Sequence, residues 1–213
     1  MTSGPRVFLA DDHTLLCELI ADLLSSQFNV VGTASDGASA VTEVARLRPD
    51  VAILDIFLPR LNGIEAALRI REAAPSTKII FLTASEDPAL AARTMRIPGA
   101  SFLLKTSSAS ELPIAIWSAI RGKRYVTPYM MEKIENGECD DVASLDLTAR
   151  EREVVQLLAE GKPMKQAAAL LNISTRTVAF HKYGVMRKLG LHSSAELVRL
   201  AVTHRLVGPV ARN

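Results

Sequence analysis

The sequence predicts an α/β domain with a doubly wound, five-stranded parallel sheet, joined by a linker to a small all-α domain of four helices. Two observations carry this prediction. Short apolar runs alternate with amphipathic stretches of helical period over the first 125 residues. From residue 147 onward the period is helical throughout. The expected boundaries are a first domain at 1–125, a linker at 126–146 and a second domain at 147–213.

The elements of the first domain follow from this alternation. The apolar runs that predict strands lie at residues 7–10, 30–31, 51–54, 79–82 and 102–104. Between them, apolar residues spaced i, i+3, i+4 predict helices at residues 14–26, 38–48, 63–74, 88–95 and 109–121. Strands that alternate with helices form βαβ units, and these build a parallel sheet that is covered on both faces. Ligands of such sheets bind at the carboxyl ends of the strands.

The linker and the second domain have different signals. Thr127-Pro128 opens a short amphipathic segment at residues 129–135, and residues 136–144 are polar and acidic with no apolar period. Four helices are then expected at residues 149–160, 164–171, 175–189 and 194–205. Ser174 is a natural N-cap for the third of these helices, which follows the second after a short turn. Two helices joined in this way form a helix-turn-helix.

Composition and charge exclude several classes of protein. Apolar residues make up 48% of the chain and charged residues 23%, as in an ordinary globular protein. The chain has neither an apolar run of about eighteen residues nor a signal-peptide pattern, so we expect a cytoplasmic protein without membrane contact. Cys17 and Cys139 form no metal-binding or disulfide pattern. Residues 147–213 hold eleven Lys and Arg against four Asp and Glu, a net charge of +7, whereas residues 1–146 carry −5. This asymmetry favours a polyanionic partner for the second domain.

Five polar residues stand at the ends of four predicted strands. Asp11 and Asp12 follow the first strand, Asp55 the third, Thr83 the fourth and Lys105 the fifth. Three neighbouring carboxylates repel one another unless a cation joins them, and Mg²⁺ prefers such oxygen ligands. A carboxylate beside Mg²⁺ can attack phosphorus, while a hydroxyl and an ammonium hold the phosphoryl oxygens. The alternative is that each Asp is only a turn or N-cap residue and that Lys105 is simply solvated.

Four segments of the first domain resemble the receiver domain of two-component response regulators, a flavodoxin-like fold. They are Asp11-Asp12 and residues 53–63, 81–84 and 99–105. The resemblance implies that a cognate histidine kinase phosphorylates Asp55. It also implies that Mg²⁺ is held by Asp12, Asp55 and the backbone carbonyl of Phe57, with Asp11 acting through water. Thr83 and Lys105 are then the phosphoryl-binding residues, and Phe102 is the aromatic switch that turns inward as Thr83 moves.

Two residues depart from the usual receiver pattern. Phe57 places a bulky apolar side chain beside the site, and we expect it to shield the acyl phosphate from hydrolysis. Pro98 is expected to end the preceding helix early and to stiffen the loop behind the switch.

The second domain resembles the LuxR-type DNA-binding domain in residues 147–155, 158–162, 173–178 and 186–190 and in His181. The resemblance implies that the third helix reads double-stranded DNA and that the fourth commonly pairs two protomers. By helical spacing, one stripe faces the bundle: Val178, Lys182, Val185 and Leu189. The expected DNA contacts are Arg176, Thr177, Ala179, Phe180, His181, Tyr183, Arg187 and Lys188.

Two features of this domain leave alternatives open. Ala179 and Tyr183 stand where polar residues are frequent in the family. Either Ala179 and Phe180 touch thymine methyl groups, or Phe180 packs on a neighbouring helix and Tyr183 only bonds a phosphate. The fourth helix is more apolar than a small bundle needs, so Leu197, Val198 and Ala201 are expected to form a homodimer contact. Such a dimer would read an inverted repeat.

Together these observations predict a phosphorylation-dependent transcriptional regulator that is not an enzyme. One alternative is a regulator that works without phosphate and whose helical module binds protein. Another is an aspartate-nucleophile phosphatase. Residues Ile56-Phe57 after Asp55 supply no second carboxylate as general acid, which weakens that alternative.

Overall fold

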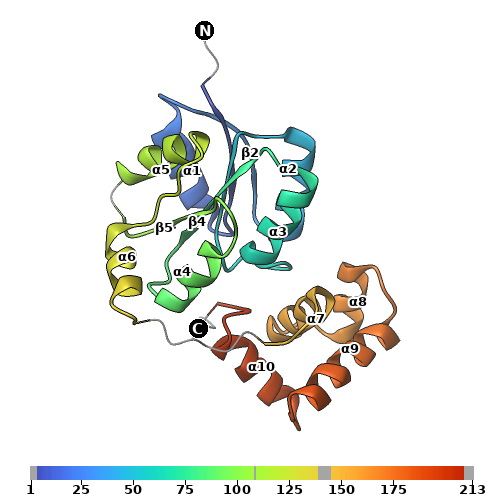
Figure 1. Ribbon diagram of the computed structural model, residues 1–213. Helices are drawn as coiled ribbons and strands as arrows, with labels where there is room; N and C mark the ends of the chain where they lie inside the picture. The colour runs from blue at the N-terminus through green and yellow to red at the C-terminus, as the bar shows by residue number, and fades with distance from the viewer. Residues whose placement is uncertain (1–3, 108, 139–144, 209–213) are drawn as a thin grey trace. The chain divides into compact units, whose positions relative to one another are not determined.

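The computed structural model describes residues 4–107, 109–138 and 145–208. These residues form two compact units, one that runs from β1 to α6 and one that contains α7 to α10 (Figure 1). Cys139 and most of the acidic part of the predicted linker lie outside the described residues. Within those ranges, every helix is too short or too polar to cross a membrane.

The first unit is built on a five-stranded parallel sheet. Its strands are β1 (Arg6–Ala10), β2 (Asn29–Ala34), β3 (Val51–Leu54), β4 (Lys78–Thr83) and β5 (Ser101–Leu104). They are arranged in the order β2-β1-β3-β4-β5, and every neighbouring pair is parallel. The predicted fold class is therefore confirmed. The strand order reverses at β1, so β1 and β3 lie next to each other at the switch point where ligands of such sheets bind.

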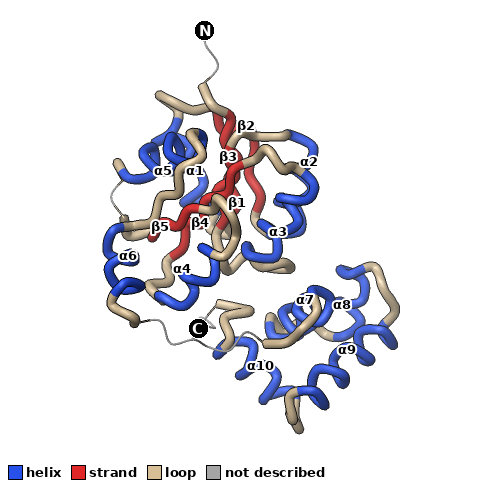
Figure 2. Tube along the Cα trace, viewed as in Figure 1, coloured by secondary structure: helices blue, strands red, loops and turns tan. Residues whose placement is uncertain are grey.

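Helices cover both faces of this sheet (Figure 2). They are α1 (Thr14–Leu24), α2 (Gly37–Leu47), α3 (Gly63–Ala73), α4 (Pro88–Met95) and α5 (Glu111–Ile120). Because side chains alternate along a strand, Phe8 and Phe81 face the core beneath α2, α3 and α4, whereas Leu9 and Ile80 face the core beneath α1 and α5. The helix α4 ends at Met95, three residues before Pro98, as the proline predicts.

An additional helix, α6 (Pro128–Glu135), belongs to the first unit although it lies within the predicted linker. It packs on α4, and its Met130 is fully buried in the core that contains Phe102. The segment before it runs along the edge strand β5 with a parallel bridge between Val126 and Phe102. The receiver-like unit therefore extends at least through residue 135.

The second unit consists of α7 (Ala149–Ala159), α8 (Met164–Leu171), α9 (Thr175–Lys188) and α10 (Ser194–Thr203). Thr148 and Glu151 form a complete capping box at the start of α7. Asn172, with a φ of 52°, makes the turn after α8. Ser174 then caps α9 by accepting a hydrogen bond from the backbone of Thr177 at 3.0 Å, as its position predicts. These caps fix the turn between α8 and α9.

Candidate functional site

The backbone of the sheet brings the predicted acidic residues to one edge. Hydrogen bonds of the sheet continue one residue beyond the strands: Asp55 donates its N–H to Ala10 at 2.8 Å, and Lys105 donates to Thr83, also at 2.8 Å. Asp11 is held by β2 in the same way, through a 3.0 Å bond to the carbonyl of Ala34. The carboxyl ends of β1, β3, β4 and β5 therefore place these side chains together.

Lys105 is the cation at the centre of this cluster. Its Nζ lies 2.6 Å from Asp11 Oδ2 and 3.6 Å from Asp55 Oδ2. All three side chains are largely buried, so solvent screens their interaction less than it would screen a surface pair. One lysine therefore contacts both buried carboxylates.

Asp55 has the most perturbed environment in the site. The residue is only 5% exposed, and Oδ1 has no hydrogen-bond partner among the residues that the structure describes. Burial raises the pKa of Asp55 to about 6, with Lys105 opposing this effect and Asp11 adding to it. A buried carboxylate oxygen without a partner is an acceptor for a cation or for a bond to phosphorus. The donor set of Asp11, Asp12 and Asp55 thus fits Mg²⁺.

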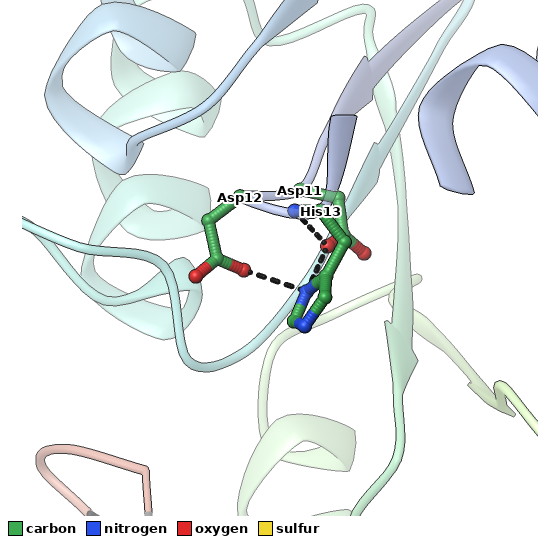
Figure 3. Close-up of side chains that lie close together, drawn as sticks. All are labelled: Asp11, Asp12 and His13. Carbon is green, nitrogen blue, oxygen red and sulfur yellow. Dashed lines mark hydrogen bonds and ion pairs between the residues drawn. The ribbon is translucent and has the colours of Figure 1, made fainter. Parts of the chain in front are cut away.

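Asp12 and His13 follow Asp11 and are exposed to solvent, and Figure 3 shows the three side chains close together. The Nδ1 atom of His13 lies 3.0 Å from Asp11 Oδ1 and 3.0 Å from Asp12 Oδ1. The backbone N–H of His13 also donates to Asp11 Oδ1 at 3.0 Å. The three side chains can share one metal ion. Sequence reasoning did not single out His13, although its place directly after two aspartates was the available signal.

Gly63 is a second residue that sequence reasoning did not single out as functional. A Cβ atom at this position would lie 2.0 Å from the carbonyl oxygen of Asp55. The N–H of Gly63 donates to the carbonyl of Ile56 at 2.8 Å, which closes the loop that follows Asp55. The absence of a side chain therefore lets α3 begin directly against the acceptor loop. The signal was a glycine eight residues after the central aspartate.

The other predicted receiver residues, Thr83, Phe57 and Phe102, are buried or half-buried in the same unit. Thr83 is fully buried, and its Oγ1 accepts the N–H of Ser85 at 3.2 Å, so its hydroxyl proton can be donated to a phosphoryl oxygen. Phe57 is half-buried and packs against the core beneath α2, α3 and α4. Phe102 is fully buried in that same core. Phe102 thus already has the inward position in this structure that the resemblance implies for the switch residue.

The backbone of Phe102 is held by the segment that precedes α6. Its N–H donates to the carbonyl of Tyr125 at 2.9 Å, and its carbonyl accepts from Thr127 at 3.0 Å. The Thr127 hydroxyl accepts the N–H of Leu104 at 3.1 Å and lies 3.2 Å from the hydroxyl of Ser107. Thr127 therefore joins the entry of α6 to the strand that carries Phe102 and leads into Lys105. Sequence reasoning treated Thr127 only as a helix start.

In the second unit, α9 presents an exposed basic and aromatic face. Phe180 is 71% exposed and Tyr183 58% exposed, and Arg176 and Arg187 are exposed as well. The exposure of Phe180 disagrees with the alternative in which it packs on a neighbouring helix. Ala179, His181 and Thr177 are half-buried on the flanks of this face. The buried side of α9 is formed by Val178, Val185 and Met186.

Two lysines of α9 are engaged within their own unit. Lys182 Nζ donates to Ser194 Oγ at the start of α10, at 2.8 Å. The helical spacing predicted that Lys182 faces the bundle, but its ammonium group reaches this exposed position. Lys188 Nζ lies 2.9 Å from Asp146 Oδ2 and also donates to the Asp146 carbonyl. This ion pair lowers the pKa of Asp146. The expected contact between Lys188 and DNA thus competes with Asp146.

The predicted dimer residues of α10 have different surroundings. Leu197 and Ala201 are buried in the core of their own unit, where α10 packs on α7. They are consequently unavailable for a contact with a second protomer, because their side chains already fill that core. Val198 is half-buried, as is Val202 one turn further along the helix. Of the three predicted dimer residues, only Val198 is therefore available for a contact through α10.

The fold and these sites define a two-domain regulator: a parallel α/β unit with an acidic, lysine-bridged site, joined to a basic helix-turn-helix unit. Comparison with known proteins agrees with this class. Residues 7–117 match the model of the response regulator receiver domain, and residues 145–201 match that of the bacterial regulatory proteins of the luxR family. The chain belongs to the two-component response regulators, with a receiver and a LuxR-type DNA-binding domain.

Similar proteins extend over nearly the whole chain. The oxygen regulatory protein NreC of Staphylococcus epidermidis is 33% identical over 215 residues, which cover 95% of this chain and 99% of NreC. The RcsB response regulator of Salmonella typhimurium is 27% identical, with a TM-score of 0.65 over 95% of this chain and 99% of RcsB. A structure of two RcsB dimers bound to two parallel DNAs is 27% identical, with a TM-score of 0.57 over 92% of this chain and 97% of that one.

Proposed function

We propose that Asp55 accepts a phosphoryl group from a cognate histidine kinase and that this modification controls binding of promoter DNA by the helix-turn-helix unit. The observation that carries the proposal is the Asp55 carboxylate, which is buried, has one unpartnered oxygen and lies beside Lys105. Membership of the response regulator family supports the same assignment. The supporting geometry comes from four strand ends that the fold brings to one edge.

Mg²⁺ is the metal that the oxygen donors fit, and it would be held by Asp12, Asp55 and the backbone carbonyl of Phe57, with Asp11 acting through water. When bound, it neutralises charge on the transferring phosphoryl group. The Asp55 oxygen forms the new bond to phosphorus as the phosphorus–nitrogen bond to the kinase histidine breaks, and the electron pair returns to the imidazole. Lys105 and Thr83 then hold phosphoryl oxygens through the ammonium and the hydroxyl.

Coupling to DNA binding is a shift in population, in which the phosphoryl group must favour the active form. The hydrogen bonds that join Phe102, Leu104 and Thr127 give the site a direct structural link to α6. Arg176, Phe180, Tyr183 and Arg187 are exposed on α9 and available to the major groove. The DNA-bound RcsB dimers support duplex DNA and a homodimer as partners, and an inverted repeat is the expected operator.

The two rival functions have less support. A phosphatase needs a general acid close to the nucleophile, and Ile56-Phe57 after Asp55 are apolar. An interaction-only regulator has no need for Asp11, Asp55 and Lys105 to meet at 2.6 to 3.6 Å. The phosphoacceptor function explains both observations.

Intact-mass measurement with Mg²⁺ and a small phosphodonor tests the acceptor directly. We expect the wild-type chain to gain one phosphoryl group and Asp55→Asn to gain none. Asp50→Asn is the matched control, because Asp50 lies outside the site at the opposite end of β3. Uptake by Asp55→Asn equal to wild type, or no uptake by either chain, would overturn the assignment.

A further inference from the structure

His13 occupies the N-cap position of α1 without capping the helix. A capping side chain accepts a hydrogen bond from the first turn, whereas the His13 side chain makes no such bond. Its ring turns back toward the two preceding aspartates instead (Figure 3). The side chain is also 71% exposed, so an ion in solvent can reach it. The position of this imidazole therefore follows from the carboxylates and not from the helix.

The spacing of His13 and Asp12 suits a common ion. His13 Nδ1 lies 3.0 Å from Asp12 Oδ1, in the carboxylate that the proposed function assigns to the metal, and it also lies at hydrogen-bond distance, 3.0 Å, from Asp11 Oδ1. Two adjacent ligands of an octahedral ion with bonds of about 2.1 Å are separated by about 3.0 Å. The second carboxylate that the proposed function assigns to this ion, that of buried Asp55, retains an oxygen with no partner among the described residues and can accept a cation. The ring can turn its Nδ1 lone pair toward an ion when Nε2 carries the proton.

We propose that His13 supplies a nitrogen ligand to the metal ion of the receiver, so that the site favours transition-series ions over Mg²⁺ more strongly than oxygen ligands alone would. Imidazole nitrogen is a good ligand for ions from Mn²⁺ to Zn²⁺, whereas Mg²⁺ prefers oxygen. His13 therefore sets which divalent ion the site takes. This inference rests on the metal site of the proposed function and adds a specificity-determining residue to it.

Calorimetric titration of the full, unphosphorylated chain with Mg²⁺ and with Co²⁺ at pH 8 tests the proposal. We expect His13→Ala to lower Co²⁺ affinity on the order of tenfold and to change Mg²⁺ affinity less than about threefold. His13→Asn keeps a good N-cap residue and should show the same loss, which separates ligand loss from helix destabilisation. His192→Ala, an exposed histidine of the second unit, should bind both ions as wild type does.

Three outcomes decide the matter. Selective loss of Co²⁺ affinity in both His13 variants supports the proposal. Unchanged Co²⁺ affinity overturns it, and tighter binding of either ion by His13→Ala also overturns it, because the ring would then hinder the ion instead of holding it. Asp12→Ala separates the two levels of inference. If it weakens Mg²⁺ binding while the His13 variants bind both ions as wild type does, the metal site stands and only the role of His13 fails.

Discussion

At the scale of single residues, the burial that destabilises the Asp55 carboxylate also suits its proposed role as phosphoacceptor. Burial keeps its carboxylate away from water, and one of its oxygens has no partner among the described residues. The same features make the group available to a metal ion and to phosphorus. The fold therefore bears a cost for a buried carboxylate, which Lys105 reduces in part and which protonation or a bound cation reduces further.

The stability of the receiver unit should reveal this cost. Burial raises the pKa of Asp55 from 3.8 to about 6, so between these values the folded state binds more protons than the unfolded state and stability falls as pH rises. We expect Asp55→Asn to be more stable than wild type by about 3 kcal/mol at pH 7, and equally stable below about pH 3, where the carboxyl is protonated in both states. Urea unfolding without divalent ions, followed by the fluorescence of Trp117, measures both. An advantage that does not change with pH would contradict the assigned cause.

Phe57 lies next to the acceptor loop and is half-buried. If its ring shields the acyl phosphate from water, Phe57→Asn should lose the phosphoryl group faster, by about tenfold if the shield is worth about 1.4 kcal/mol of barrier. The decay of phosphorylated protein in time-resolved intact-mass spectra measures this rate. Phe57→Leu is the control that keeps an apolar side chain. A rate for Phe57→Asn no higher than that of wild type would exclude shielding.

At the scale of elements, α6 is tied to the strand that carries the switch. Thr127→Val keeps the shape of the side chain but removes the acceptor of the Leu104 N–H. We expect a loss of about 1–3 kcal/mol in unfolding free energy, because a buried donor is left unpaired. Thr42→Val is the control, since the exposed Thr42 hydroxyl donates to the carbonyl of Ala38 within α2. Trp117 fluorescence during urea unfolding again reports on this unit. Equal stability of the two variants would show that the hydrogen bond between Thr127 and Leu104 does not stabilise the fold.

The exposed face of α9 makes its own prediction. Arg176→Ala should weaken binding to DNA duplexes of random sequence and reduce the slope of log affinity against log salt by about 1, as expected for one phosphate contact. Fluorescence anisotropy at several salt concentrations measures this slope. Arg199→Ala removes an exposed arginine of α10 and serves as the control. If both variants lower the slope equally, Arg176 contributes only to the net positive charge of the unit and makes no specific contact with a phosphate.

The elements also show what the sequence could predict and why the rest was missed. Strong apolar runs predicted β1, β3 and β4 closely. The strand β2 was recognised only at Val30 and Val31 because Gly32 and Thr33 interrupt the apolar pattern of this half-exposed edge. Residues at the strand ends were predictable because parallel topology brings them to one edge. The burial of Leu197 depends on which side of α10 meets α7, and a helical pattern alone does not distinguish core from interface.

At the scale of the whole molecule, two units of opposite charge share one chain. The acidic first 146 residues carry the phosphoacceptor candidate, and the basic remainder carries the exposed α9 face. The two family models that match the chain correspond to these two units. We propose that phosphorylation of Asp55 in the first unit controls the DNA affinity of the second unit.

The most direct test is the DNA affinity of the full chain with and without phosphorylation. A duplex is first selected from a random pool with the phosphorylated wild type, and anisotropy then compares wild type and Asp55→Asn, each with Mg²⁺ and with or without the phosphodonor. We expect that only wild type with donor gains affinity. Equal affinity in all four samples, or a gain by Asp55→Asn with donor, would contradict it.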